Sequence, residues 1–130
     1  MSDQFTYSKK TIEYFKHPKY SKEIKNADAT AELGNLKCGD VFKIFLKIEK
    51  GKIKDISYLT YGCMAAIAAC EAFCKLVKGK TISQAKKITF EDIKKELEGM
   101  PEFKVHCAVM IIETFHKAIK EYENKKNRKE

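Results

Sequence analysis

A run of strict alternation between residues 41 and 48 is the feature that most constrains how this chain folds. Every second residue of the run is apolar: Phe42, Ile44, Leu46 and Ile48. Lysines at positions 43 and 47 stand between them. Side chains of a strand point alternately to its two faces, so this pattern predicts a strand with one buried face.

A second extended run follows after a short polar turn. Glu49-Lys50-Gly51-Lys52 has the composition of a tight turn, and residues 53–61 then alternate less regularly. One phase of that second run contains Ile53, Ser57, Leu59 and Tyr61. The two runs and the turn predict an antiparallel hairpin.

The spacing of apolar residues becomes helical after Gly62. One stripe follows a 4-3-4-3 spacing: Cys63, Ile67, Cys70, Cys74 and Val77. This predicts an amphipathic helix that Gly79 closes. Thr81 to Ala85 predicts a short helical turn.

Three further helices are predicted from caps and breakers. Ser8 to about Lys16 forms one that Pro18 stops, and Thr89 with Asp92 at the third helical position opens another that ends at Gly99. The last and longest begins near Val105, beyond Pro101, and frays after Tyr122. Its predicted apolar stripe is Val105, Val109, Ile112, His116 and Ile119.

Length and charge restrict the organisation and the partners. The 130 residues suit one domain over residues 1–124, followed by a charged, disordered tail at 125–130. The net charge of +8 favours acidic partners, but the lysines are spread over every element and no aromatic-basic stacking motif occurs. We therefore expect no nucleic acid, and, without a run near 18 apolar residues, no membrane span.

Five cysteines carry more information than the charge does. Their odd number and the polar start of the chain do not suit a secreted disulfide framework, so we expect a cytoplasmic protein with reduced thiols. Cys38, Cys63 and Cys107 each fall at an end of a predicted element, where loops bring distant residues together. Cys70 lies roughly 10 Å along the helix from Cys63, which predicts that it and Cys74 fill the core.

The neighbours of the three end cysteines add possible metal ligands. Asp40 follows Cys38 by two residues, and His106 directly precedes Cys107 at a predicted helix start, where the helix dipole favours a thiolate. Zinc accepts three thiolates with an aspartate or a histidine, and iron–sulfur clusters accept such sets as well. A hard carboxylate among thiolates holds a soft cluster more weakly, which suits delivery better than storage.

Four ordered blocks of the chain resemble a known family. They are Gly34-Asn35-Leu36-Lys37-Cys38-Gly39-Asp40, Thr60-Tyr61-Gly62-Cys63-Met64-Ala65-Ala66-Ile67-Ala68, Val77-Lys78-Gly79-Lys80-Thr81 and Val105-His106-Cys107. In this order they resemble the iron–sulfur cluster assembly scaffolds of the IscU and NifU N-terminal-domain type. The resemblance runs from about Tyr7 to Lys120.

The resemblance implies both a fold and a function. The fold is α+β, a three-stranded antiparallel sheet with helices packed on one face, whose additional strand comes from residues 29–33. The function is that of a non-enzymatic scaffold. Members accept sulfur from a cysteine desulfurase, combine it with iron, hold a transient 2Fe–2S cluster and pass it to apo-proteins.

The resemblance also assigns roles to single residues. The cluster ligands match Cys38, Asp40, Cys63, His106 and Cys107. Cys107 or Cys38 would accept the persulfide, Asp40 would be the labile oxygen ligand, and Lys104 would be an auxiliary residue near them. A monomer and a dimer that shares one cluster both fit three cysteines per chain.

One departure from the family pattern and one alternative function limit what the resemblance implies. Where many members read Leu-Pro-Pro-Val-Lys, this chain has Met100-Pro101-Glu102-Phe103-Lys104, so recognition by an Hsp70-type chaperone is not carried over. The alternative function is a zinc protein that accepts sulfur from, or regulates, a cysteine desulfurase. Its zinc ligands would be Cys38, Asp40, Cys63 and either His106 or Cys107.

Overall fold

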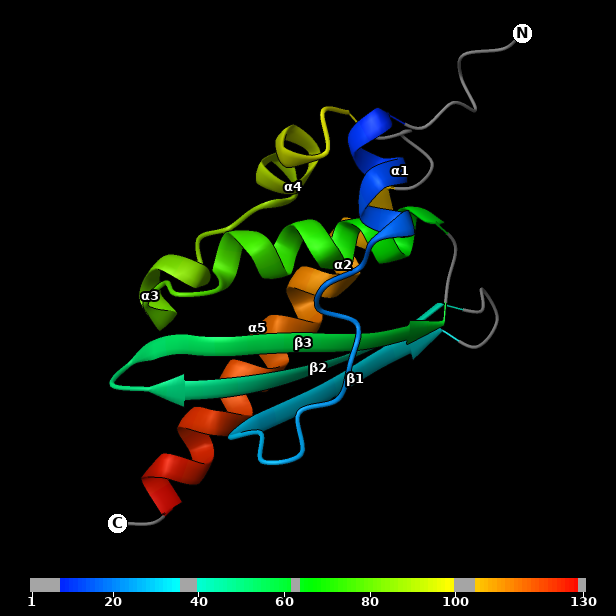
Figure 1. The fold of residues 1–130 in the computed structure, drawn as a ribbon. Coiled ribbons are helices and arrows are strands. Elements are labelled where there is room, and N and C mark those ends of the chain that lie inside the picture. The colour runs from blue at the N-terminus through cyan, green and yellow to red at the C-terminus, as the bar shows by residue number, and fades with distance from the viewer. Residues whose placement is uncertain (1–7, 36–39, 62–63, 100–104, 129–130) are drawn as a thin grey trace, which may run out of the picture.

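The computed structural model describes residues 8–35, 40–61, 64–99 and 105–128. Its elements, in chain order, are α1 (Lys9–Lys16), β1 (Ala29–Asn35), β2 (Asp40–Glu49), β3 (Lys52–Tyr61), α2 (Met64–Val77), α3 (Ile82–Ala85), α4 (Phe90–Glu96) and α5 (Val105–Arg128) (Figure 1). The three strands form one antiparallel sheet in the order β1-β2-β3, and α2 and α5 pack on one of its faces. The α+β prediction is confirmed, including the additional strand β1.

Residues 17–28, called the crossing segment below, first pass α2 and the outer edge of β3 and then cross the opposite face of the sheet. It runs from the outer edge of β3 to the start of β1, in front of the sheet in Figure 1. Ser21 forms a parallel bridge with Tyr58, and the Tyr58 N–H donates to the Tyr20 carbonyl at 2.9 Å. The side chains of Phe45 and Ser57 are buried on this face. The sheet therefore has cover on both sides over part of its length.

The apolar alternation predicted for the first strand is confirmed. Phe42, Ile44 and Leu46 are fully buried, and Ile48 packs against the same core. These side chains point toward α2 and α5, because they belong to one phase of β2 and alternate residues share a face.

The phase predicted for the second strand is wrong beyond its first residue. Ile56 and Tyr58 are fully buried with Ile53, whereas Leu59 and Tyr61 are 41% and 77% exposed. The cause is a bulge, since Lys47 pairs with Asp55 but Ile48 pairs with Ile53. The extra residue shifts the phase by one, so Ile53 shares a face with Ile56 rather than with Ser57.

Helix α2 lies at the centre of the core because its side chains are small. Its buried positions include five alanines: Ala65, Ala66, Ala68, Ala69 and Ala72. Small side chains allow close approach of neighbouring elements, and Phe73 fills the space toward α5. Its ring meets that of Phe115 edge to face, with centroids 5.2 Å apart.

The helical period predicted for α5 is confirmed, and Ile119 is buried as predicted, but the centre of the buried face differs from the prediction. Val109 is 36% exposed and His116 is exposed, whereas the core face is formed by Cys107, Ala108, Ile111, Phe115, Ala118 and Ile119. This is a rotation by about one residue, or roughly 100°. The reason is packing: a face of small residues around Phe115 fits against α2 and the sheet more closely than one of β-branched residues.

Helix α5 also continues to Arg128, beyond the predicted end near Tyr122. The expectation of a disordered tail is thereby corrected for residues 125–128. No glycine or proline follows Pro101, and Lys125 pairs with Glu121 one turn earlier at 3.9 Å. Good helix formers with such a pair prolong an exposed helix.

The predicted helix starts are confirmed at the N-terminal and middle helices. At the start of α1 the Ser8 side chain accepts the Thr11 N–H at 3.0 Å. At the start of α3 the Thr81 hydroxyl accepts the Gln84 N–H at 3.1 Å. At α4 the Asp92 carboxylate accepts the Thr89 N–H at 2.8 Å. Over the described ranges, none of the helices is both long and apolar enough to cross a bilayer.

Candidate functional site

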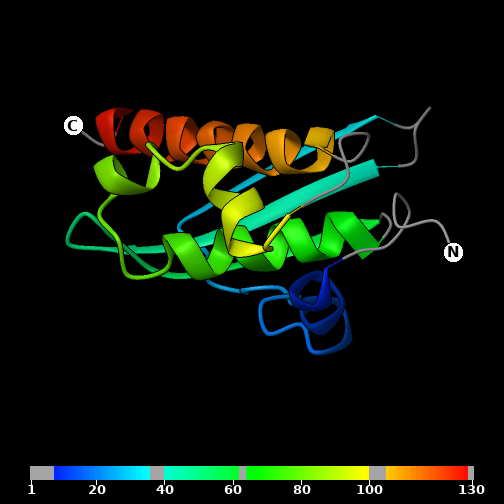
Figure 2. The ribbon, with the colours of Figure 1, turned by 90° about the horizontal axis from the view of Figure 1, so that it is seen from above.

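One end of the molecule gathers the described ends of β1, β2, β3, α2 and α5. Asn35 pairs with Asp40 and Val41 pairs with Tyr61, so the three strands have ends at the same edge. Seen from above, the first turns of α2 and α5 lie at that end as well (Figure 2). We call it the loop end.

The structure describes only some of the predicted site residues at this end. Asp40 is the first residue of β2, where only its backbone is described, and His106 and Cys107 lie in the first turn of α5. Cys38, Cys63 and Lys104 are outside the described residues. The convergence of the five predicted ligands on one ion or cluster, with Lys104 nearby, therefore stays a prediction.

His106 and Cys107 form the described part of the site. The Cys107 side chain is fully buried against the core, and His106 is exposed. The distance between Cys107 Sγ and His106 Nε2 is 3.7 Å, within reach of a hydrogen bond to sulfur. The rotation of α5 relative to the predicted face places this thiol on the inner side of the helix.

This arrangement has two opposing effects on the thiol. Burial favours the neutral S–H, whereas an imidazole and the free N–H groups of a helix start favour the thiolate. The thiolate is the form that binds metal and attacks sulfur.

Cys70 and Cys74 fill the core, as predicted. Both are fully buried in α2. Burial raises the pKa of the Cys70 thiol well above its ordinary value, and neighbouring Cys74 and Cys107 raise it further. Burial likewise raises the pKa of Cys74. Both thiols stay protonated at neutral pH and are poor nucleophiles.

Glu71 is a buried carboxylate that the sequence reasoning missed. It is fully buried on α2, and its oxygens accept the Lys19 N–H at 2.8 Å, the Tyr20 N–H at 2.9 Å and the Tyr58 hydroxyl at 2.8 Å. Burial, and then the neighbouring Cys70 and Glu71 groups, raise the pKa of Tyr58, so its hydroxyl stays protonated and donates to Glu71. The sequence did contain a signal for a buried acid, because Glu71 follows Ile67 by four residues and therefore lies on the apolar side of the predicted helix.

A second polar cluster joins α1, α2 and α4. Glu96 accepts the Tyr14 hydroxyl at 2.5 Å and pairs with Lys75 at 3.0 Å. Burial raises the pKa of Tyr14 to about 12, with help from the bond to Glu96. Burial alone would raise the pKa of Glu96, but the bonds from Tyr14 and Lys75 outweigh it and lower that pKa.

Neither polar cluster is a metal site. Within the described ranges, no three side chains of His, Cys, Asp or Glu come together in a way that could hold an ion. A site of the predicted composition thus depends on residues on either side of the described segments at the loop end.

Comparison with known proteins identifies the family. The model of the NifU-like N terminal domain matches residues 6–129, nearly the whole chain. The chain belongs to the NifU-like N-terminal domain family. The predicted resemblance is therefore confirmed.

Two relatives show how much of the chain this NifU-like family likeness covers. The protein named iron-sulfur cluster assembly scaffold protein IscU in Aquifex aeolicus is 37% identical over 128 residues, covering 97% of this chain and 82% of that protein. The protein of the same name in Buchnera aphidicola is 36% identical over 126 residues, covering 94% of this chain and 98% of that one. Both names describe scaffolds rather than enzymes, in agreement with the predicted class.

A solved structure supports the fold of the NifU-like domain. The N-terminal part of a nitrogen-fixing NifU-like protein from Brucella abortus superposes with a TM-score of 0.77 at 17% identity, covering 95% of this chain and 97% of that one. The likeness shows that the three-stranded sheet and its helices are arranged as in that structure.

Proposed function

We propose that this protein is a scaffold on which a 2Fe–2S cluster is assembled from iron and sulfane sulfur, and from which the cluster passes to apo-proteins. The observation that carries the proposal is the pair of His106 and buried Cys107 at the loop end, in a chain 37% identical to a named scaffold. Iron, sulfur and the cluster are cargo in this function, and the protein supplies ligands.

Sulfur acceptance is assigned to Cys107 or Cys38. A cysteine desulfurase presents a persulfide, and the acceptor thiolate attacks its outer sulfur. A new S–S bond forms on the scaffold, the old one breaks, and the desulfurase cysteine leaves as a thiolate. An Nε2–H of His106 that donates across the 3.7 Å contact would favour the thiolate on Cys107. Reduction of the bound sulfur to sulfide then requires electrons from an external donor.

Cluster holding is assigned to Cys38, Cys63 and Cys107, with Asp40 as the exchangeable oxygen ligand. His106 is the alternative fourth ligand, and Lys104 is proposed to steady anionic sulfur. Thiolates bind iron strongly, whereas a carboxylate is a harder and weaker partner for a cluster. A mixed set of this kind suits a cluster that has to leave, and the recipients are apo iron–sulfur proteins.

The test is assembly of the cluster under anaerobic conditions. The protein is incubated with ferrous iron, cysteine and a cysteine desulfurase, visible absorption is followed, and transfer to an apo-ferredoxin is then measured. We expect sulfur-to-iron charge-transfer bands to appear and to move to the ferredoxin. Cys38→Ala, Cys63→Ala and Cys107→Ala should each abolish stable assembly.

Cys74→Ala is the matched control, since it removes a thiol from the core and leaves the loop end unchanged. Assembly in this variant should equal that of the wild type. If no charge-transfer band forms while zinc stays tightly bound, the scaffold proposal is wrong and the zinc protein acting on a desulfurase takes its place. If Cys74→Ala alone prevents assembly, the assignment of the ligands is wrong.

A further inference from the structure

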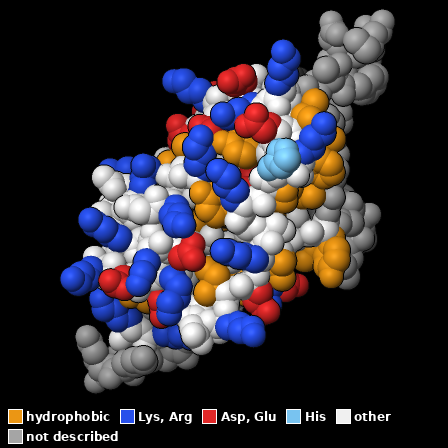
Figure 3. Space-filling view, in the orientation of Figure 1, with side chains coloured by type: hydrophobic (Ala, Val, Ile, Leu, Met, Phe, Trp, Pro, Cys, Tyr) orange, Lys and Arg blue, Asp and Glu red, His pale blue; other side chains and the backbone are white. Residues whose placement is uncertain are grey.

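The end of the molecule opposite the loop end has an excess of exposed lysines. It is formed by the β2–β3 turn and the residues that follow α2, which pair with each other: the Ile53 N–H donates to the Lys80 carbonyl and the Ile82 N–H to the Gly51 carbonyl. Five exposed lysines belong to it: Lys50, Lys52, Lys54, Lys78 and Lys80. We call this surface the basic end; Figure 3 shows Lys and Arg side chains outnumbering acidic ones over it, at the left.

Internal ion pairs neutralise only part of the basic end. Lys54 pairs with Glu49 at 2.9 Å and Lys78 with Asp55 at 3.5 Å. Over the described residues, none of the ion pairs involves the other three lysines, at positions 50, 52 and 80. Three positive charges are thus left for an external partner.

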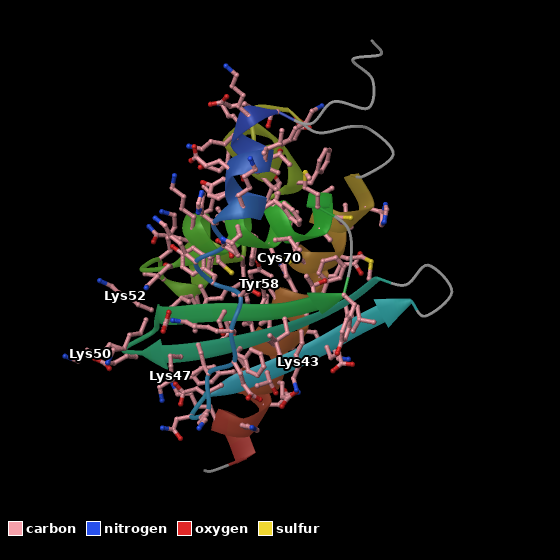
Figure 4. The ribbon with its side chains drawn as sticks, turned by 45° about the vertical axis from the view of Figure 1, so that its right-hand side comes forward. Lys43, Lys47, Lys50, Lys52, Tyr58 and Cys70 are labelled. Carbon is pink, nitrogen blue, oxygen red and sulfur yellow. The ribbon has the colours of Figure 1, made fainter. Side chains whose placement is uncertain are left out.

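The backbone at the turn shows that a lysine stands there at some conformational cost. Lys50 has φ 54° and Gly51 has φ 75°, the two left-handed residues of a tight hairpin turn. The first of these positions favours Gly, which has no Cβ to approach the following carbonyl oxygen, or Asn, whose side chain hydrogen-bonds locally. The tip of the hairpin instead carries a cation, and Lys50 and Lys52 project outward from it (Figure 4).

A shallow hollow lies beside the same turn. It has a volume of about 270 Å³ and is lined by Glu49, Lys50, Lys52, Ile53, Lys54 and Gly79. Lys52 and Lys54 stand two residues apart, about 7 Å along an extended chain, which is also the spacing of alternate carboxylates in an extended acidic segment. Of the two, Lys52 has no internal ion pair in the described chain, whereas Lys54 also holds Glu49 at 2.9 Å.

We propose that the basic end is a docking surface for an acidic, extended protein segment. The ten-residue strand β2, which begins at Asp40, spans the distance between the two ends, roughly 30 Å at about 3.3 Å per residue. A partner bound at the basic end therefore leaves the loop end open. The surface can hold a partner in place while the loop end exchanges its cargo, and this inference holds whichever metal the loop end binds.

The composition of the surface favours a protein partner over other polyanions. The exposed large hydrophobic side chains of the described chain are Phe15, Leu59, Tyr61, Phe90 and Val109, none of which belongs to the basic end. Single-stranded nucleic acids need aromatic platforms for stacking, and membrane surfaces need apolar side chains that insert. Arg, which reads phosphates and guanines bidentately, occurs once in the chain, at position 128.

The test measures binding of a fluorescently labelled poly-glutamate peptide by anisotropy, at low and at physiological salt. The hairpin variant carries Lys50→Gln, Lys52→Gln and Lys80→Gln. The control variant carries Lys9→Gln, Lys16→Gln and Lys95→Gln, exposed lysines of α1 and α4 whose removal changes the net charge equally. Circular dichroism checks that both variants are folded.

We expect the hairpin variant to bind about tenfold more weakly and the control variant to change less than about twofold, since each exposed charge pair contributes modestly. In NMR spectra, changes in the amide chemical shifts of Gly51, Lys52 and Gly79 on adding the peptide, with no change at His106, would place the peptide at the basic end. Equal weakening in both variants would mean that net charge alone attracts the peptide, and the proposal fails. Tighter binding of single-stranded DNA or phosphatidylserine vesicles, lost in the hairpin variant, would replace the acidic segment with that partner.

Discussion

The Tyr58 hydroxyl donates a 2.8 Å hydrogen bond to the buried carboxylate of Glu71 and so joins β3 to α2, next to the start of the crossing segment. The same carboxylate holds the backbone N–H groups of Lys19 and Tyr20. One acid thus fastens three segments that are far apart in sequence. Buried carboxylates are tolerated only when their oxygens are satisfied, and here three donors do so.

Replacing Glu71 should therefore loosen the crossing segment. In Glu71→Gln one carboxylate oxygen is replaced by an NH2 group, which donates hydrogen bonds and cannot accept them. At least one buried donor therefore loses its partner. We expect a loss of about 2 kcal/mol in the free energy of unfolding, measured with urea. Hydrogen exchange at the amides of Lys19 and Tyr20 should accelerate. Glu91→Gln, on the exposed side of α4, is the control and should change neither quantity.

Removal of the Tyr14 hydroxyl should change how stability depends on alkaline pH. Burial raises the pKa of Tyr14 from 10.0 to about 12, so its contribution is full below 10 and is lost as the pH rises toward 12. Tyr14→Phe should be less stable than the wild type at neutral pH, and the two curves should converge as the pH approaches 12. Unfolding midpoints across that range test this, and parallel curves would contradict it.

Loss of the His106 imidazole should slow sulfur acceptance at Cys107. If the 3.7 Å contact favours the thiolate, His106→Ala should accept sulfur from a desulfurase about fivefold more slowly, the effect of one modest hydrogen bond. Mass spectrometry of the persulfide measures the rate. His116→Ala, an exposed histidine further along α5, is the control. Unchanged rates in His106→Ala would show that the contact has no part in sulfur transfer.

Asp40→Ala should lengthen the life of the assembled cluster and slow its transfer. The variant lacks the weakly bound oxygen ligand that a recipient would displace first. We therefore expect about a tenfold change in the cluster's lifetime and in its rate of transfer. Decay of the charge-transfer absorption and the rate of transfer to apo-ferredoxin measure the two effects. A shorter-lived cluster in this variant would overturn the role proposed for Asp40.

Local patterns predicted the elements well but not always the faces they bury. The hairpin, the pairing of Thr89 with Asp92 at the start of α4, and the core role of Cys70 all follow from spacing and residue type. The faces of β3 and α5 did not, because a bulge opposite Lys47 and the packing around Phe115 determine the phase. Period is a local property of the chain, whereas phase depends on the partner that each element meets.

Sequence patterns alone were enough to predict most of the elements in their order, the family, and the core positions of Cys70 and Cys74. These depend on neighbours in the chain and on blocks of residues that stand in a fixed order. Only the tertiary structure decided that Cys107 lies on the inner face of α5, that Glu71 holds the crossing segment, and that unpaired lysines gather opposite the loop end. Each of these results from contacts between distant segments, which form only when the whole chain packs.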